Sequence, residues 1–232
     1  MPESLENRLA SIQQKITAAC AKAHRDPDTV ALLPVTKTFD AEVVRGAASL
    51  GLRRFGENKT QEIRQKFEAL SDLNLQWVLI GHLQTNKARD AARFASEVQS
   101  LDRLSLAQAL DARLQAEGRA LDVLVQVKTS DEPSKFGLEP AELPVFLKQL
   151  ASLDTLRVKG LMTLAVNSPD AQAVRACFRS LREWRDRLRN EGFEQVQRLS
   201  MGMSGDFELA IEEGSNEVRI GSAIFGRRDY SH

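Results

Sequence analysis

The sequence of 232 residues lacks several features that mark secreted, membrane-bound or metal-binding proteins. Only two cysteines are present, Cys20 and Cys177, and neither lies in a CxxC or Cys/His ligand spacing. We therefore expect buried thiols in a reducing compartment and no metal site. No basic stretch followed by an apolar segment opens the chain, and no apolar run is long enough to span a bilayer. These absences predict a cytoplasmic protein with no membrane partner.

An excess of charge is missing as well. Lys+Arg and Asp+Glu both number 32, whereas proteins that bind nucleic acid through its phosphates usually carry a clear basic excess. One basic stretch runs from Arg179 to Arg189, but Glu183 and Asp186 interrupt it. This pattern is typical of a solvated helix face, so we expect no nucleic-acid partner.

The chain does have a regular alternation of short apolar runs and amphipathic segments, with 42% hydrophobic residues for a core. Runs rich in β-branched and aliphatic residues predict strands at 29–35, 53–56, 75–81, 96–102, 120–127, 156–163, 196–202 and 216–221. Apolar residues at helical spacing predict helices over 4–24, 40–51, 58–70, 85–95, 105–118, 140–153, 168–192, 206–214 and 222–228.

This alternation predicts the fold class, an α/β protein built as a single (β/α)8 TIM barrel with an extra N-terminal helix. Strict alternation requires parallel strands joined by crossover helices, and such barrels take about 250 residues. The alternative is an open doubly wound sheet, which usually has a glycine-rich turn after its first strand. "VTKTFD" (35–40) has no glycine. No Pro/Ser-rich linker is present, so we expect one domain over residues 1–232. Pro34 predicts a local irregularity in the first strand.

Functional side chains of such barrels lie at the C-terminal ends of the strands. The residues that follow the predicted strands are Lys37, Glu57, Asn58, His82, Asp102, Lys128, Met162 and Thr163. Lys37 directly follows an apolar run, where partial burial favours the neutral, nucleophilic form of an amine. Taken alone, a lysine at a strand end is more commonly a solvated side chain.

Two Gly/Ser clusters, 200–205 and 219–222, follow the seventh and eighth strands. In this fold the loops after those strands form the usual phosphate site, where glycines let backbone N–H groups approach the oxygens. Ser204 and Ser222 add hydroxyl donors, although each cluster alone also fits an ordinary turn. An amine and a phosphate site together suggest a ligand with an aldehyde and a phosphate, and pyridoxal 5′-phosphate has both.

Arg219 precedes the second cluster and could reach the pyridine nitrogen of such a ligand. A protonated arginine keeps that nitrogen unprotonated, which makes the ring a weak acceptor of carbanion charge. An internal salt bridge with Glu217, or with another carboxylate of the barrel, explains the same residue equally well on spacing alone.

The motifs "VTKT" (35–38), "FGENKTQE" (55–62), "IGHLQTNK" (80–87), "SKFGL" (134–138), "GLMT" (160–163) and the block 199–226 identify a family. With them the chain resembles the pyridoxal phosphate homeostasis proteins, also called proline synthetase co-transcribed proteins, which look like the alanine racemase barrel without its second domain. Two positions depart from the family pattern. Val78 replaces a histidine, and Lys128 replaces an asparagine, which would put a second amine near the barrel mouth.

The resemblance implies a set of cofactor-binding residues. Lys37 would form a Schiff base with pyridoxal 5′-phosphate, and Arg219 would face the pyridine nitrogen. Ser204 and the backbone of Met203, Gly221 and Ser222 would hold the phosphate. Asn58 would line the cofactor edge, and His82 and Met162 would lie near the ring.

Turnover is the open question. Racemisation needs two bases, and alanine racemase takes its second from a tyrosine of the second domain, whereas the only tyrosine here is Tyr230. We therefore expect a protein of vitamin B6 homeostasis that holds the cofactor without efficient catalysis and passes it to apo-enzymes. The alternatives are a racemase-like enzyme, with Lys37 and His82 or a water as bases, and an aldolase-type barrel for sugar phosphates. A barrel of this size can be monomeric, with a dimer as the alternative.

Overall fold

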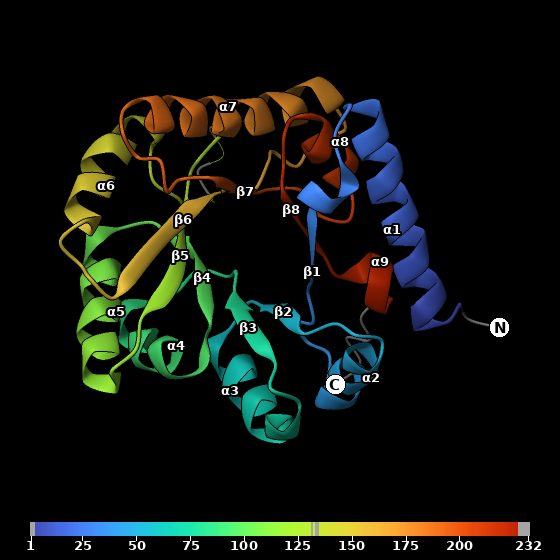
Figure 1. Cartoon of the computed structure of the whole chain (residues 1–232), viewed down its shortest axis with the longest axis horizontal. Helices are drawn as coiled ribbons and strands as arrows, with labels where there is room; N and C mark the ends of the chain where they lie inside the picture. Colours follow the sequence, from blue (N-terminus) through green and yellow to red (C-terminus); the bar gives the residue numbers. More distant parts are fainter. Residues whose placement is uncertain (1–2, 131, 133–134, 227–232) are drawn as a thin grey trace.

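A computed structural model describes residues 3–130, 132 and 135–226. Its strands run round the centre of the molecule and its helices lie outside them (Figure 1). The strands are β1 Ala31–Pro34, β2 Arg54–Glu57, β3 Gln76–Leu79, β4 Glu97–Leu101, β5 Leu121–Gln126, β6 Leu156–Met162, β7 Arg198–Ser200 and β8 Glu217–Ile220. Each prediction of a strand is confirmed, with ends that differ by a few residues.

The strands form one parallel sheet of eight in the order β1-β8-β7-β6-β5-β4-β3-β2. The two outer strands of this order meet at a parallel bridge between Val35 and Gly56. There the Thr36 N–H donates to the Gly56 carbonyl at 3.0 Å. The sheet therefore closes on itself, which confirms the predicted (β/α)8 barrel over the doubly wound alternative.

The α-helices are α1 Leu5–Lys22, α2 Ala41–Ser49, α3 Thr60–Ala69, α4 Ala88–Phe94, α5 Leu104–Glu117, α6 Leu143–Leu150, α7 Ala171–Asn190, α8 Phe207–Glu212 and α9 Ser222–Phe225. Short 3₁₀ turns cover Pro27–Thr29, Ser71–Leu73, Thr85–Lys87 and Pro140–Glu142. The extra helix α1 packs beside α8 and α9 (Figure 1). Arg227 and Arg228, which the sequence placed in the last helix, lie outside the described residues.

Short polar side chains start several of these helices. Ser4, Asp40 and Asp170 each accept a hydrogen bond from a backbone N–H of the first turn, as expected of N-cap residues. Between the helices and the barrel lies a continuous apolar core, in which Cys20 and Cys177 are buried as free thiols. Among the described residues, no helix is both long enough and apolar enough to cross a membrane.

The irregularity expected at Pro34 is absent from the β1–β8 ladder, where Pro34 lies opposite Ile220 in regular register. Ala31 donates its N–H to the Asn216 carbonyl just before β8, Val35 donates to Ile220 of β8, and Thr36 donates to Gly56 of β2. This alternation turns the nitrogen of Pro34 toward β2, where pairing begins only at Val35. The prediction was wrong because the missing donor falls on the side of the strand that has no ladder.

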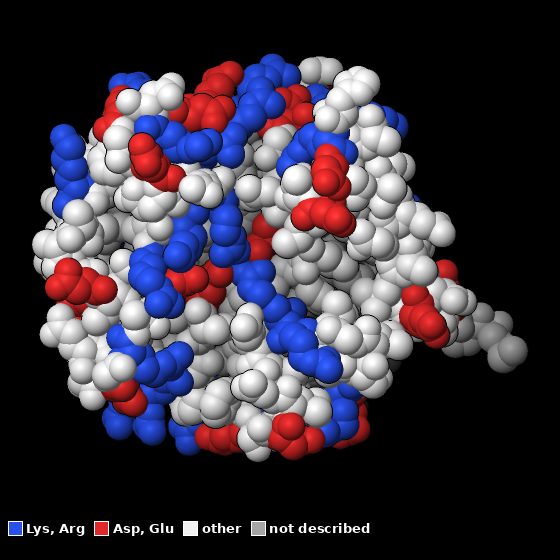
Figure 2. Space-filling view, viewed as in Figure 1, with Lys and Arg blue, Asp and Glu red and all other residues white. Residues whose placement is uncertain are grey.

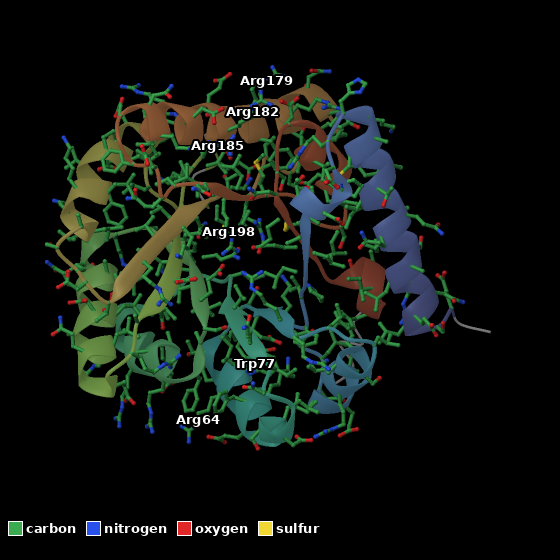
Figure 3. All side chains as sticks on the ribbon, viewed as in Figure 1. Arg64, Trp77, Arg179, Arg182, Arg185 and Arg198 are labelled. Atoms are coloured by element: carbon green, nitrogen blue, oxygen red, sulfur yellow. The ribbon has the colours of Figure 1, made fainter. Side chains whose placement is uncertain are left out.

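Charged residues occupy the first positions of four strands and fill the N-terminal end of the barrel. Arg54 and Arg198 both pair with Glu217, at 2.5 and 2.6 Å, and both pair with Glu97, at 2.8 and 2.7 Å. Figure 2 shows basic side chains with acidic ones between them over the middle of this view. Figure 3 places Arg198 inside the ring of strands. We call these four residues the barrel floor.

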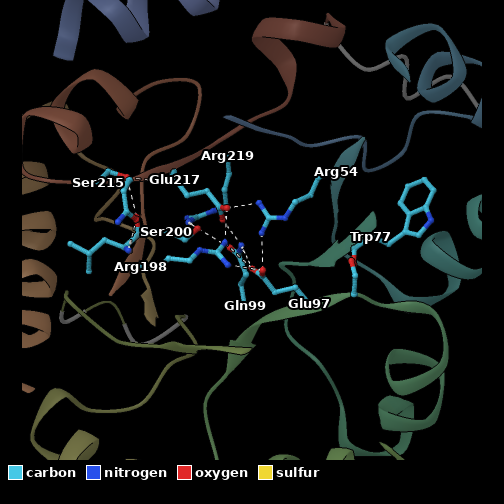
Figure 4. A network of polar contacts seen from close by, with 12 residues as sticks. Arg54, Trp77, Glu97, Gln99, Arg198, Ser200, Ser215, Glu217 and Arg219 are labelled. Carbon is cyan, nitrogen blue, oxygen red and sulfur yellow. Dashed lines mark hydrogen bonds and ion pairs between the residues drawn. The ribbon is translucent and has the colours of Figure 1, made fainter. Parts of the chain in front are cut away.

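A second polar layer lies two residues further along the same strands, as the alternation of side chains in a strand requires. Gln99 donates to Glu217, and its oxygen accepts from the Ser200 hydroxyl at 2.7 Å. Arg219 donates to that same hydroxyl at 2.7 Å, as Figure 4 shows. The barrel interior is therefore a connected polar column that runs from the floor to Arg219.

Candidate cofactor site

A cavity of about 490 Å³ opens at the C-terminal end of the barrel, opposite the floor. It is lined by Val35, Lys37, Asn58, Ile80, Gly81, His82, Gln126, Lys135, Phe136, Leu164, Met203, Ser204, Gly205, Arg219, Gly221 and Ser222. Eight of the nine site residues predicted from the sequence are in this set, and the missing one is Met162. Residues far apart in the chain thus meet in one cavity, as strand ends of a barrel do.

The two Gly/Ser loops form one wall of the cavity. They follow β7 and β8, which are neighbours in the barrel, and the hydroxyls of Ser204 and Ser222 lie 3.4 Å apart. Gly202 has a φ of 97°, and a Cβ there would lie 2.6 Å from the Ala210 side chain. Only glycine fits this turn, so the loop itself requires Gly202, whether or not a ligand binds there.

The backbone of Met203 is engaged within its own loop. Its N–H donates to Asp206 Oδ1 at 2.6 Å, so in this structure it does not point to the cavity as an unpaired donor. Burial raises the pKa of Asp206, while this hydrogen bond and the charge of Arg219 act in the opposite direction. The Met203 side chain is 40% exposed at the rim.

Arg219 forms the base of the cavity and is almost fully buried. Its guanidinium donates to the Ser200 hydroxyl and, at 2.8 Å, to the Thr163 carbonyl. Burial lowers the pKa of Arg219 to about 10, so the side chain is still a cation at neutral pH. Among the described residues it forms no ion pair, because Glu217 is paired with the floor arginines. The salt-bridge explanation of Arg219 is therefore wrong.

Lys37 lies directly beyond β1, half-buried, and lines the same cavity as Ser204 and Gly221. A Cβ on Gly221 would approach the Val35 carbonyl to 3.1 Å, which shows how closely the β8 loop lies against the end of β1. The amine-bearing segment and the Gly/Ser wall therefore share one short stretch of barrel rim.

The opposite wall comes from the loops after β2 and β3. A Cβ on Gly81 would lie 2.2 Å from the Asn58 carbonyl, so these two loops touch through their backbones. The ring of His82 stacks on Phe136 with centroids 3.7 Å apart, and its Nδ1 lies 3.5 Å from Asp102. Asn58 and His82 are thus at the cavity, as predicted.

Two sequence predictions need correction. Met162 is fully buried within β6 and does not line the cavity. Lys128 pairs with Glu139 at 2.9 Å and also lies outside the lining, because β5 ends at Gln126 and the chain turns away sooner than expected. Val78, the other departure from the family pattern, is fully buried and outside the lining.

The sequence reasoning missed Gln126, Lys135 and Phe136 at the cavity. Gln126 is the last residue of β5, so a more accurate strand end would have identified it. Lys135 donates to the Ala165 carbonyl at 2.5 Å and pairs with Glu132. Lys135 and Phe136 belong to the quoted "SKFGL" motif, which was a usable signal.

The charge of the lining has one sign. Lys37, Lys135 and Arg219 line the cavity, and no aspartate or glutamate is among the described lining residues. A cavity with three cationic side chains and several hydroxyl and backbone groups suits an anionic ligand of small-molecule size.

The barrel and its cavity define a protein of the alanine racemase barrel class. Residues 8–229 match the family "Alanine racemase, N-terminal domain". An alanine racemase from Clostridium difficile shares the fold, with a TM-score of 0.72 at 14% identity over 94% of this chain and 57% of that one. More specifically, the chain belongs to the pyridoxal phosphate homeostasis protein family, which confirms the resemblance.

The relatives of that name match over almost their whole length. The protein from Aquifex aeolicus is 41% identical over 96% of this chain and 98% of its own. The protein from Escherichia coli K12 is 40% identical over 98% of both chains. PipY of Synechococcus elongatus, solved with pyridoxal phosphate bound, is 35% identical with a TM-score of 0.84, over 96% of this chain and 100% of PipY.

Proposed function

We propose that this protein binds pyridoxal 5′-phosphate as part of vitamin B6 homeostasis. The amine of Lys37 would condense with the aldehyde of the cofactor, forming a Schiff base and releasing one water. Ser204, Ser222 and the backbone at Gly221 would hold the phosphate. Arg219 would donate to the pyridine nitrogen, with Asn58 and His82 beside the ring.

The observation that carries this proposal is the shared cavity. Lys37, the Ser204–Ser222 pair and Arg219 all line it, and each suits one part of the cofactor: aldehyde, phosphate and ring nitrogen. Full-length relatives carry the name of this function, and PipY was solved with the cofactor bound.

We further propose that the bound cofactor undergoes little turnover. A pyridoxal ring stabilises carbanions best when its nitrogen is protonated, and a cationic Arg219 opposes that protonation. The buried free thiols of Cys20 and Cys177 fit a reducing cytoplasm. In this setting the protein, proposed to act as a monomer, would store a reactive aldehyde and deliver it to apo-enzymes.

The test is to incubate the protein with pyridoxal 5′-phosphate, reduce with borohydride and locate the modified lysine by peptide mass spectrometry. We expect the label on Lys37 and its loss in Lys37→Ala, with Lys148→Ala as a control at an exposed lysine. A label spread over surface lysines, or an unmodified Lys37, would contradict the proposal.

One observation favours a racemase-like enzyme as the second candidate. His82 lies at the cavity with its Nδ1 3.5 Å from Asp102, an arrangement that suits a general base. Solvent deuterium incorporation into alanine and other amino acids at their α-carbons distinguishes the two functions. A storage protein shows none above the free cofactor, whereas the enzyme shows an incorporation that is lost in Lys37→Ala and in His82→Ala.

A further inference from the structure

The residue before Lys37 is tied to two buried charged side chains. Thr36 is fully buried, and its hydroxyl donates to Glu57 Oε1 at 2.6 Å. Lys66 Nζ donates to the Thr36 carbonyl at 2.8 Å and to the same Glu57 oxygen at 2.6 Å. These contacts fix both the side chain and the backbone of Thr36 from β2 and α3.

The residue after Lys37 is held in the same way. The Thr38 N–H donates to Glu62 Oε2 at 2.7 Å, and Lys66 Nζ lies 3.7 Å from that oxygen. Thr38 has a φ of 69°, a left-handed conformation that is strained for a β-branched residue. Such strain persists where the surroundings over-determine the backbone, and it is found at functional sites.

These contacts are poorly suited to a role in stability alone. Glu57 is fully buried and Lys66 is 5% exposed, and the desolvation of a buried ion pair offsets much of its Coulomb attraction. Among the described residues, Glu57 Oε2 has no hydrogen-bond partner at all. What the arrangement does achieve is a single geometry for the peptide units on either side of Lys37.

We propose that Glu57, Glu62 and Lys66, here called the lysine clamp, are positioning residues that aim the Lys37 amine into the cavity. This inference rests on the proposed function, since it concerns the reaction of Lys37 with an aldehyde. The clamp contributes through geometry, because a reacting group displaced by about 1 Å can lose about 100-fold in rate.

The experiment compares two ligands on the full-length protein. Pyridoxal 5′-phosphate reports the reaction of Lys37, followed as the rate of borohydride-trapped label on that residue. 4′-Deoxypyridoxine 5′-phosphate has no aldehyde and reports only the binding of phosphate and ring. For Glu57→Gln and Lys66→Met we expect labelling to slow about 10-fold or more, with less than about a 2-fold change in analogue affinity. Glu68→Gln and Lys148→Met are the matched surface controls.

The outcomes separate the clamp from the proposed function. An unlabelled Lys37 in the wild-type protein removes both. Normal labelling in wild type and in both variants overturns the clamp alone. Parallel losses of labelling rate and of analogue affinity would show that the three clamp residues only support the fold. That result also overturns the proposed positioning role. If either variant does not fold, Glu62→Ala, which removes the Thr38 contact from a partly exposed position, is judged by the same criteria.

Discussion

The two ends of the barrel handle charge in opposite ways. At the floor, Arg54 and Arg198 face Glu97 and Glu217, so two cations meet two carboxylates. At the cavity, three cationic residues line the space and no carboxylate is among the described lining residues. At the floor the cations and carboxylates face one another within the barrel, whereas the described residues that line the cavity are cationic, polar or apolar and include no carboxylate.

This difference separates structural from functional charges within one interior. Arg219 belongs to the same polar column as the floor, through Ser200 and Gln99, yet it is the member that forms no ion pair among the described residues. The Ser200 hydroxyl and the Thr163 carbonyl accept hydrogen bonds from Arg219, but a buried cation without a carboxylate is still costly in the folded protein unless a ligand supplies the opposite charge. Sites of this kind trade stability for binding.

The largest effect is expected from breaking the floor with Glu217→Gln. Burial would raise the pKa of Glu217, but Arg54 and Arg198 hold it below its ordinary value, so the group is a carboxylate at neutral pH. Removing that charge leaves two arginines with one carboxylate. We expect the free energy of unfolding to fall by about 3–5 kcal/mol, measured by urea denaturation.

The control is Glu68→Gln, which removes an exposed helical ion pair with Arg64 and should cost less than about 0.5 kcal/mol. A floor variant no less stable than this control would show that the four floor residues contribute no more than a surface pair. Cofactor analogue affinity should change little in Glu217→Gln, since the residue does not line the cavity.

The sequence was a good guide to the barrel and a partial guide to its interior. Strand–helix alternation and the Gly/Ser loops depend on local residue patterns, so the strands and the wall at Ser204 and Ser222 were predictable. The partners of Arg219 and Glu217 were not, because they depend on which strands face each other across a closed barrel. Lys128 was misjudged for a simpler reason: β5 ends at Gln126, one residue earlier than predicted, and Gln126 lines the cavity instead. Met162 ends β6 and is fully buried there.

Glu57 is a second buried carboxylate, and its pKa shifts upward whereas the pKa of Glu217 shifts downward. Burial raises the pKa of Glu57 to about 7, with Lys66 and Thr36 opposing the shift. A raised carboxyl pKa contributes stability below about pH 4.5, and that contribution is lost as the pH rises through about 7. We expect the stability difference between wild type and Glu57→Gln to fall by about 3 kcal/mol over this window.

The measurement is urea denaturation of both proteins at several pH values between about 4.5 and about 8, which span the ordinary carboxyl pKa of 4.5 and the raised pKa of about 7. Taking the difference cancels groups that titrate alike in the two proteins. A difference that stays constant, or that grows with pH, would mean that Lys66 keeps Glu57 ionised throughout and that its unpartnered Oε2 never carries the proton.

Arg219→Met tests the cavity end of the barrel. In contrast to Glu217→Gln, we expect a small change in stability and a large change in ligand affinity. The substitution removes a buried cation that has no ion-pair partner among the described residues, so the stability change should be smaller than that of the floor variant. Affinity for 4′-deoxypyridoxine 5′-phosphate should fall about 10- to 100-fold, as for loss of a charge-assisted hydrogen bond. Arg157→Met, at an exposed arginine paired with Asp122, is the matched control. A large loss of stability with unchanged analogue affinity would show that Arg219 has a structural role, like the floor residues, and does not bind the ligand.

The smallest expected effect concerns the hydroxyls of the Gly/Ser wall. The hydroxyl oxygens of Ser204 and Ser222 lie 3.4 Å apart. A hydrogen bond from a neutral hydroxyl contributes about 1 kcal/mol to binding, so Ser204→Ala and Ser222→Ala should each weaken analogue binding about 5-fold. Because the two hydroxyls would contact one phosphate, the double variant should deviate from the sum of the single effects. Ser152→Ala, an exposed serine bonded to Gln149, should leave affinity unchanged. Two results would contradict this placement of the phosphate: strictly additive losses of affinity for the aldehyde-free analogue, or equal losses of affinity for pyridoxal, which has no phosphate. Either result would place the phosphate elsewhere in the cavity and leave the cationic side chains as its only anchors.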